Sequence, residues 1–375
     1  MLLLATLAFT APLKINILYL QEQLPIPPTL SNVIKDPKDG GLMGARLAAQ
    51  DVQKTAHFFN QDFSLQIFSS TKPQELKTKL SEHLKENTFV LLDTSTDFTS
   101  SIAKTHAKKG LFFNVSNEDN LLRTKQCRPN LFHTVASNAM LSDALVQFLV
   151  ARNWKNWFMI TGKNEQDKQF LASILRSQKR FGGKITTQKE WDFNTDLRRV
   201  ASKEMSLFTQ SKKDYDVVLV SDKLGDFGEY IYFNTWLPRP LAGTQGLTPV
   251  TWHKVIEQWG AAQLQSRFES FANRWMNDID YSAWVSIFAI SELVKSTKSA
   301  AFSENLKAIY QDDFSFGGYK GRKLSFRSFN GQMRQNIALV HSRGLVSISP
   351  QEGFLHPASE LDTLGFSKQE VNCSP

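Results

Sequence analysis

The chain has 375 residues, of which 41% are hydrophobic and 21% are charged, a balance typical of a globular protein with about two domains. Its 19 glycines and 13 prolines are too few for a collagen-like or low-complexity chain, and no internal apolar run approaches the roughly 18 residues of a membrane-spanning helix. The net charge of +8 favours anionic partners. Because the basic residues are scattered along the chain, we do not expect nucleic acid to be one of these partners.

The first eleven residues are apolar and read MLLLATLAFTA. They are too short to span a bilayer but match the hydrophobic region of a secretory signal, with Ala8, Thr10 and Ala11 as a cleavage region. The basic residues that usually precede such a region are missing, so a buried first strand is the alternative. We expect residues 1–13 to be a signal peptide and the protein to be periplasmic.

The two cysteines, Cys127 and Cys373, are far apart in the sequence. A periplasmic location would permit a disulfide between them, and closing so long a loop would stabilise the fold by up to about 5 kcal/mol. Two independent thiols are the alternative. A catalytic role for Cys127 finds no support, because its spacing to His133 matches no nucleophile signature.

The first third of the chain alternates strand-like and helix-like segments. We expect strands over residues 14–20, 64–69, 88–92 and 110–115, and helices over residues 42–56, 73–87 and 100–109. In the second helix, for example, Leu76, Leu80 and Leu84 recur at four-residue intervals. Repeated strand–helix units predict a parallel sheet with helices on both faces.

The same pattern restarts after a boundary near residues 128–134. We expect helices over residues 140–152, 168–181 and 197–211, and strands over residues 157–161, 184–191 and 215–221. Two such units in tandem predict two α/β lobes, residues 14–133 and 134–246. Residues 247–375 mix helical and β-like stretches and are too irregular for a third core, so we expect this segment to return and complete both lobes.

Known catalytic and metal-binding motifs are absent from the sequence. It contains no GxxxxGK[ST] phosphate loop, no HExxH, no GxSxG and no GxGxxG after the first strand. Its seven histidines and two cysteines show no metal-ligand spacing. The sequence therefore predicts neither a catalytic constellation nor a metal site.

The helix that opens as GGLMGARLAAQDVQKTA, the tandem lobes and the returning tail resemble the type I periplasmic solute-binding proteins of the leucine/isoleucine/valine-binding kind, over about residues 14–365. Gly44-Ala45 and Leu47-Ala48-Ala49 stand as in that family's G…NGAxLAVEEIN helix. Three segments, CRPNLFHTVAS, TWLPRPLAGTQGL and HPASELDTLGF, resemble the subgroup of ABC-transporter binding proteins associated with PQQ-dependent alcohol dehydrogenase systems. The resemblance implies two doubly wound parallel-sheet lobes joined by a hinge.

The resemblance also implies where a ligand binds, namely between the lobes and beyond the carboxyl ends of the strands. In lobe 1, Gln21 and Glu22 follow the first strand. Thr94, Ser95 and Thr96 stand where the family places hydroxyls and backbone N–H groups against a substrate carboxylate, ahead of a helix that favours an anion. The residues expected to bind ligand are Gln21, Asp93, Thr94, Ser95, Thr96, Ser116, Lys163, Trp191, Trp236, Arg239, Gln245 and Trp252.

The chain departs from the family pattern at two places. The DxxYG turn that supplies a tyrosine to amino-acid ligands reads NEQDK at residues 164–168, and the YDAV helix motif reads WVSI at residues 284–287. Both changes argue against an amino-acid substrate. Aromatic and basic residues are prominent instead, and a planar polyanion such as PQQ fits them, although packing in the core is the alternative for any single tryptophan. They are Trp191, Trp236, Arg239, Trp252, Trp284, Tyr319, Lys320 and Arg322.

These features predict a non-enzymatic, periplasmic substrate-binding component of an ABC transporter. Its expected ligand is a small, anionic aromatic solute, with PQQ or a metabolite of a PQQ-dependent alcohol dehydrogenase pathway as candidates. No resident cofactor is expected. The expected partners are the permease transmembrane subunits, with a quinoprotein dehydrogenase as a further candidate. A ligand sensor with the same fold, branched-chain amino-acid binding and an enzyme with a dispersed site are the alternatives.

Overall fold

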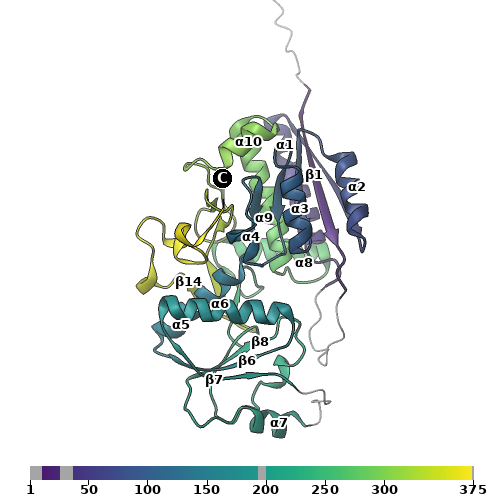
Figure 1. Ribbon diagram of the computed structural model, residues 1–375. Helices are drawn as coiled ribbons and strands as arrows, with labels where there is room; N and C mark the ends of the chain where they lie inside the picture. Colours follow the sequence, from purple (N-terminus) through teal and green to yellow (C-terminus); the bar gives the residue numbers. More distant parts are fainter. Residues whose placement is uncertain (1–10, 26–36, 193–199, 374–375) are drawn as a thin grey trace, which may run out of the picture.

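The computed structural model describes residues 11–25, 37–192 and 200–373, which form two α/β lobes stacked end to end (Figure 1). The expected signal peptide lies outside these residues except for its final positions, and the first strand begins at Leu13. Within the described residues, no helix combines the length and the apolar character needed to cross a membrane.

Lobe 1 is built on a five-stranded parallel sheet, sheet A, in the order β2-β1-β3-β4-β5. The strands are β1 (Leu13–Glu22), β2 (Gln61–Ser70), β3 (Thr88–Asp93), β4 (Leu111–Asn114) and β5 (Leu131–His133). The inner strands β1, β3 and β4 are mostly buried, as expected for a parallel sheet with both faces covered. The strand order reverses between β1 and β3, which makes this the topological switch point of the sheet.

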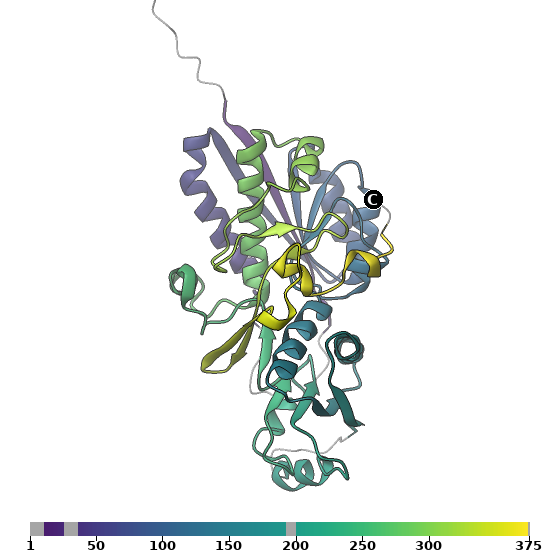
Figure 2. The ribbon, with the colours of Figure 1, turned by 90° about the vertical axis from the view of Figure 1, so that its left-hand side faces the viewer.

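Helices cover both faces of sheet A (Figure 2). They are α1 (Leu42–Ala56), α2 (Pro73–His83), α3 (Thr96–Thr105) and the short α4 (Leu121–Thr124). Apolar side chains of α2 and α3 pack with those of β1 and β3 on one face. On the other face α1 packs against α9 (Asp278–Thr297) from the returning part of the chain. Gly44 permits this close approach, because a Cβ there would collide with the backbone carbonyl of Asp280.

Lobe 2 repeats the plan on a four-stranded parallel sheet, sheet B, in the order β7-β6-β8-β9. Its strands are β6 (Asn156–Thr161), β7 (Lys184–Glu190), β8 (Val217–Ser221) and β9 (Leu241–Gly243). Its helices are α5 (Asn138–Ala151), α6 (Glu165–Phe181) and α7 (Ala201–Phe208). The helices α5 and α6 pack on one face and α7 on the other, and the strand order reverses between β6 and β8.

The chain after β9 returns to lobe 1 and then runs along both lobes. Its elements are β10 (Thr248–Val250), α8 (Ala261–Ala272), α9, α10 (Phe302–Ile309), β11 (Ser325–Phe326), β12 (Met333–Arg334), β13 (Ile337–His341) and β14 (Gly344–Ser349). Antiparallel pairing of β10, β13 and β14 forms a small sheet beside α5. Short 3₁₀ turns occur at His57–Phe59, Gly228–Tyr230, Gln258–Gly260, Glu352–Phe354, Glu360–Thr363 and Lys368–Glu370.

The C-terminal segment contacts lobe 2 before it ends on lobe 1. It lies at the junction of the lobes in Figure 2, where Gln147 of α5 donates to Thr363 and Arg176 of α6 pairs with Glu370. Cys373 then forms a disulfide with Cys127, with 5.6 Å between their Cα atoms, a separation normal for such bridges.

Candidate functional site

The carboxyl ends of the two sheets meet each other across the junction of the lobes. Lys223, two residues after β8, donates to Glu118 in the loop after β4, with 2.5 Å between Nζ and Oε2. Beside it, Asn120 of lobe 1 donates to Ser173 of α6 at 2.8 Å. Because ligands of open α/β sheets bind beyond the carboxyl ends of the strands, these facing edges form the candidate site.

The switch point of lobe 1 is closed by a contact between β1 and the turn after β3. Ser95 directly precedes α3, and both its backbone N–H (2.8 Å) and its hydroxyl (2.6 Å) donate to one oxygen of Glu22. A carboxylate is favoured at this position, because the first N–H groups of a helix are unpaired and carry a partial positive charge. In this structure the carboxylate belongs to the chain itself.

Asp93 forms a second hydrogen-bonded group at the same edge. It accepts from Tyr19 (3.2 Å) and Gln21 (3.1 Å), and it is also bonded by Ser116. Burial raises the pKa of Asp93, and the hydrogen bonds from Ser116, Gln21 and Tyr19 oppose that rise. The structure therefore brings together three residues predicted for the site, Gln21, Asp93 and Ser116.

The threonines on either side of Ser95 fix the surrounding loops. The hydroxyl of Thr94 is buried and bonds that of Thr99 at 2.7 Å. Thr96 donates to Asp119 at 2.9 Å and lies beside Asn117, which ties α3 to the loop after β4. Both hydroxyls thus have partners within the protein.

Helix α3 begins at Thr96, four residues before the predicted start, because only two residues separate β3 from the helix.

The carboxyl edge of lobe 2 is similarly occupied by internal contacts. Asp222 accepts the backbone N–H groups of residues 226–228 at 2.7–2.9 Å, and Gln245 donates to the Asp222 carbonyl at 3.1 Å. Burial raises the pKa of Asp222. Lys163 is half exposed and forms an ion pair with Asp192. Gln245 and Lys163 therefore lie at the predicted edge, each already bonded to a neighbour.

Two of the predicted tryptophans are core residues. Trp191 is buried in lobe 2 and stacks on Phe227, with 4.7 Å between ring centroids. Trp252 is 2% exposed in lobe 1, where it stacks on Tyr281 at 4.6 Å and donates to Gln265. The expectation that these rings face a ligand is not met, because each ring is enclosed by its own lobe.

Trp236 and Arg239 lie at the opposite end of sheet B from the candidate site. The Trp236 N–H donates to Thr209 and Arg239 pairs with Asp214 at 3.2 Å; both partners precede β8 and so lie at its amino end. The chain reaches this end because β9 is parallel to β8, so the connection between them must return to the amino edge. These two residues do not join the group at the carboxyl edge.

The remaining aromatic and basic residues that suggested a planar anion are bonded to or packed against other residues of the protein. Trp284 is buried against Phe288, and Arg322 is exposed and pairs with Glu360. Lys320 is buried and donates to the carbonyls of Thr251, directly after β10, and Asn336. Trp252, Trp284, Tyr319 and Lys320 do gather inside lobe 1, where they pack around Tyr281 of α9 and against one another. The other four predicted residues lie elsewhere, so the full aromatic and basic lining is not assembled at the carboxyl edges.

Sequence reasoning missed the ion pair between Glu118 and Lys223 and did not foresee the role of Glu22. A signal was available, because each of the three residues lies two or three positions after the end of a predicted strand. The charges at this edge are mainly acidic on the lobe 1 side, where Glu22, Asp93, Glu118 and Asp119 gather. Lys163 and Lys223, on the lobe 2 side, both pair with carboxylates.

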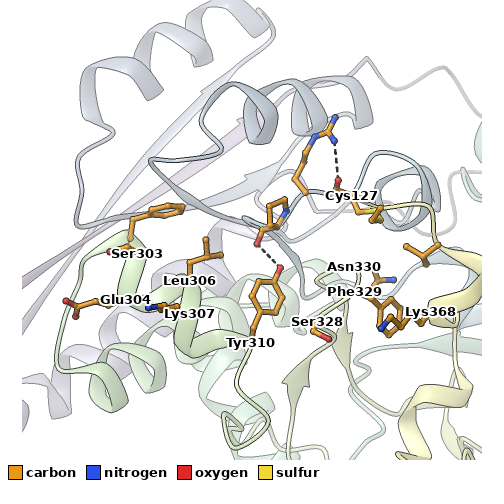
Figure 3. A pocket seen from close by; sticks show the side chains of 15 residues that line it. Cys127, Ser303, Glu304, Leu306, Lys307, Tyr310, Ser328, Phe329, Asn330 and Lys368 are labelled. Carbon is orange, nitrogen blue, oxygen red and sulfur yellow. Dashed lines mark hydrogen bonds between the residues drawn. A yellow bond between two sulfur atoms is a disulfide. The ribbon is translucent and has the colours of Figure 1, made fainter. Parts of the chain in front are cut away.

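A separate cavity of about 830 Å³ lies on lobe 1 beside the disulfide (Figure 3). Helix α10 and the C-terminal segment line it, and Tyr310 donates across it to the carbonyl of Pro129 at 2.7 Å. Residues 127–130 precede β5, so this cavity lies at the amino edge of sheet A. It is distinct from the candidate site.

Two doubly wound lobes with facing carboxyl edges and a returning segment decide the fold. It is that of the type I periplasmic binding proteins. This confirms the predicted fold class. Residues 40–218 also match the sequence profile of the periplasmic binding protein family. No curated protein sequence is significantly similar to the chain.

Solved periplasmic binding proteins superpose over nearly the whole chain at low sequence identity. A periplasmic binding protein from Burkholderia mallei is 15% identical, with 96% of this chain and 98% of that chain covered and a TM-score of 0.67. A leucine-, isoleucine-, valine-, threonine- and alanine-binding protein from Brucella ovis, in a closed conformation, is 13% identical over 98% and 97%, with a TM-score of 0.66. An ABC transporter solute-binding protein from R. palustris, in complex with benzoate, is 14% identical over 91% and 98%, with a TM-score of 0.64.

Proposed function

We propose that this protein is the substrate-binding component of an ABC transporter. It captures a small solute between the two carboxyl edges and presents it to the permease subunits. The observation that carries this proposal is the ion pair between Glu118 and Lys223, which shows the two edges in contact across the junction. The family match over residues 40–218 and the two-lobed fold support it.

The mechanism follows from the arrangement of the lobes. Three short connections, after β5, after β9 and after β12, join the lobes side by side, and such connections act as a hinge. The C-terminal segment crosses from lobe 2 to lobe 1 as a fourth link. A solute that contacts both edges binds the closed arrangement more tightly than the open one, and it shifts the equilibrium by that difference. The proposal places the protein in the periplasm, as the signal-like N-terminus predicts.

The chemical class of the solute is a separate part of the proposal. The related structures include a leucine-, isoleucine-, valine-, threonine- and alanine-binding protein and a complex with benzoate, so small organic solutes fit the fold. The predicted preference for PQQ relied on a lining of tryptophans and basic residues. Because Trp191 and Trp252 are core residues and Trp236 and Arg239 lie at the far edge, we no longer favour PQQ as the ligand. A quinoprotein dehydrogenase partner stays a prediction.

The test is a binding screen with the purified protein lacking residues 1–13. Thermal shift assays with amino acids, amines, polyols, aromatic acids and PQQ are followed by calorimetric titration of every compound that raises the melting temperature. A true ligand at one hundred times its Kd stabilises the fold by about 2.7 kcal/mol. We expect one-to-one binding, abolished by Asn120→Trp, which places a bulky ring between the edges. The Trp236→Ala variant, altered at the far edge, is the matched control. Failure of every solute class to bind would contradict the proposal.

A further inference from the structure

Glu22 occupies the position at which lobe 1 would otherwise accept an anion. It is the last residue of β1, and Ser95 directly precedes α3 after β3, so their contact lies at the switch point where ligands of such sheets bind. This inference rests on the proposed function, since it concerns which solutes the same site accepts.

The hydrogen bonds show how completely Glu22 fills this position. One carboxylate oxygen accepts from both the backbone N–H (2.8 Å) and the hydroxyl (2.6 Å) of Ser95. A serine before a helix usually turns its hydroxyl to accept from the first turn. Ser95 makes no such cap bond, and its hydroxyl donates to Glu22 instead. The two donors that an incoming carboxylate would use are therefore already taken.

The neighbouring donors are taken in the same way. Tyr19 and Gln21 both donate to Asp93, and Gln21 in turn accepts from Ser69. A solute carboxylate arriving at this edge would meet the acceptor oxygens of Glu22 and Asp93. A solute with amino, ammonium or hydroxyl groups would meet acceptors that match its donors.

We propose that Glu22 is a specificity-determining residue, whose carboxylate fills the anion position before α3 and so excludes carboxylate solutes. The solutes taken by this protein then approach lobe 1 through hydrogen-bond donors or a positive charge. This refines the substrate class to amines and polyhydroxylated compounds and replaces the anionic class that the sequence predicts.

The test uses acetate as the probe of the anion position, and the backbone amide of Ser95 is followed by NMR in the protein lacking residues 1–13. In Glu22→Ala, we expect acetate to shift the Ser95 resonance saturably, with an affinity at least tenfold higher than in the wild type. Glu22→Gln keeps the shape of the side chain but not its charge, so its acetate affinity should lie between those of the wild type and Glu22→Ala. This variant replaces Glu22→Ala in the test if the alanine variant does not fold. The double variant Glu22→Ala/Ser95→Ala should lose most of the acetate affinity that Glu22→Ala gains.

A matched control is Glu75→Ala. Glu75 also accepts a serine hydroxyl, from Ser70 at 2.6 Å, but it is exposed on α2. This variant should bind acetate no better than the wild type.

Benzoate and benzylamine, which share a ring and differ in charge, provide the second readout. Glu22→Ala should raise the affinity for benzoate relative to that for benzylamine at least tenfold.

The outcomes separate this inference from the proposed function. If a solute of the screen binds the wild type but Glu22→Ala gains no acetate affinity at Ser95, the role of Glu22 is refuted and the binding function stands. If Glu22→Ala gains acetate affinity but no solute binds the wild type, the proposed function fails, and with it the role of Glu22 in substrate choice. If neither protein binds acetate or any solute, both are refuted.

Discussion

Lys223 of lobe 2 and Glu118 of lobe 1 form an ion pair across the junction of the lobes, and their side chains are 19% and 28% exposed. The Lys223 ammonium also lies over the ring of Phe170, at 5.0 Å from its centroid. The two loops that carry the pair follow β8 and β4, so the pair is a direct link between the carboxyl edges of the two sheets.

Removing this link should shift the lobes apart. For Lys223→Gln we expect a larger radius of gyration by small-angle X-ray scattering in the absence of solute, because a partly buried pair of this kind contributes about 1 kcal/mol or more to the closed arrangement. The control is Lys163→Gln, since Lys163 pairs with Asp192 within lobe 2. Identical scattering curves for the two variants would contradict a role of the pair in holding the lobes together.

The packing of α1 on α9 should be sensitive to a single methyl group. Gly44→Ala places a Cβ against the backbone of Asp280, which cannot move without shifting α9. We expect the free energy of unfolding to fall by about 1–3 kcal/mol in urea denaturation. At Gly317 a Cβ would meet no atom within 4 Å, so Gly317→Ala should be close to neutral. Equal stability of the two variants would show that the helices are not in close contact.

The two loop tryptophans should respond differently to truncation. Trp252→Ala removes a buried, stacked ring from lobe 1, and we expect a loss of about 3–5 kcal/mol in the free energy of unfolding. Trp236 is 55% exposed at the far edge of lobe 2, so Trp236→Ala should change stability by about 0.5 kcal/mol or less and leave solute affinity unchanged. A selective loss of affinity in Trp236→Ala would revive the aromatic site predicted from the sequence.

The buried Lys320 should make stability depend on pH. Burial lowers the pKa of Lys320 to about 7, although Asp278 opposes the change. Since the unfolded chain then binds this proton more tightly than the folded one, the contribution of Lys320 to stability rises between pH 7 and about pH 10. From pH 7 to pH 9 the free energy of unfolding of the wild type should gain about 2 kcal/mol relative to Lys320→Met. Parallel pH profiles of the two proteins would rule out the lowered pKa.

The sequence predicts the sheets well, because strands covered on both faces are continuous apolar runs that stand out from the amphipathic helices between them. The expected strands at residues 14–20 and 88–92 lie within β1 and β3, and the expected strand at residues 215–221 contains β8 and begins two residues before it. The order of the strands and the antiparallel pairing of β13 with β14 depend on contacts between distant segments, which local patterns do not encode.

The candidate site is predicted in part for a related reason. Gln21, Asp93 and Ser95 follow strands directly, and the carboxyl ends of parallel strands share one edge, so their proximity could be inferred. The loop-like surroundings of Trp236 and Arg239 predict that both residues face the ligand. Because β9 runs parallel to β8, however, the loop that carries them lies at the opposite edge of the sheet. The pairing of Glu22 with Ser95 depends on side-chain orientation, and the sequence alone does not show it.

The disulfide between Cys127 and Cys373 attaches the C-terminal segment, which crosses the junction of the lobes, to lobe 1. The chain leaves Cys127 in lobe 1, passes through all of lobe 2, returns, and contacts α5 and α6 again before the second cysteine fastens it beside the first. The backbone between the two cysteines and the disulfide together form a closed ring, which contains all of lobe 2 and is closed on lobe 1. The C-terminal segment is therefore a further covalent link between the lobes, in addition to the three hinge connections, and any motion that separates the lobes must also be accommodated by this segment.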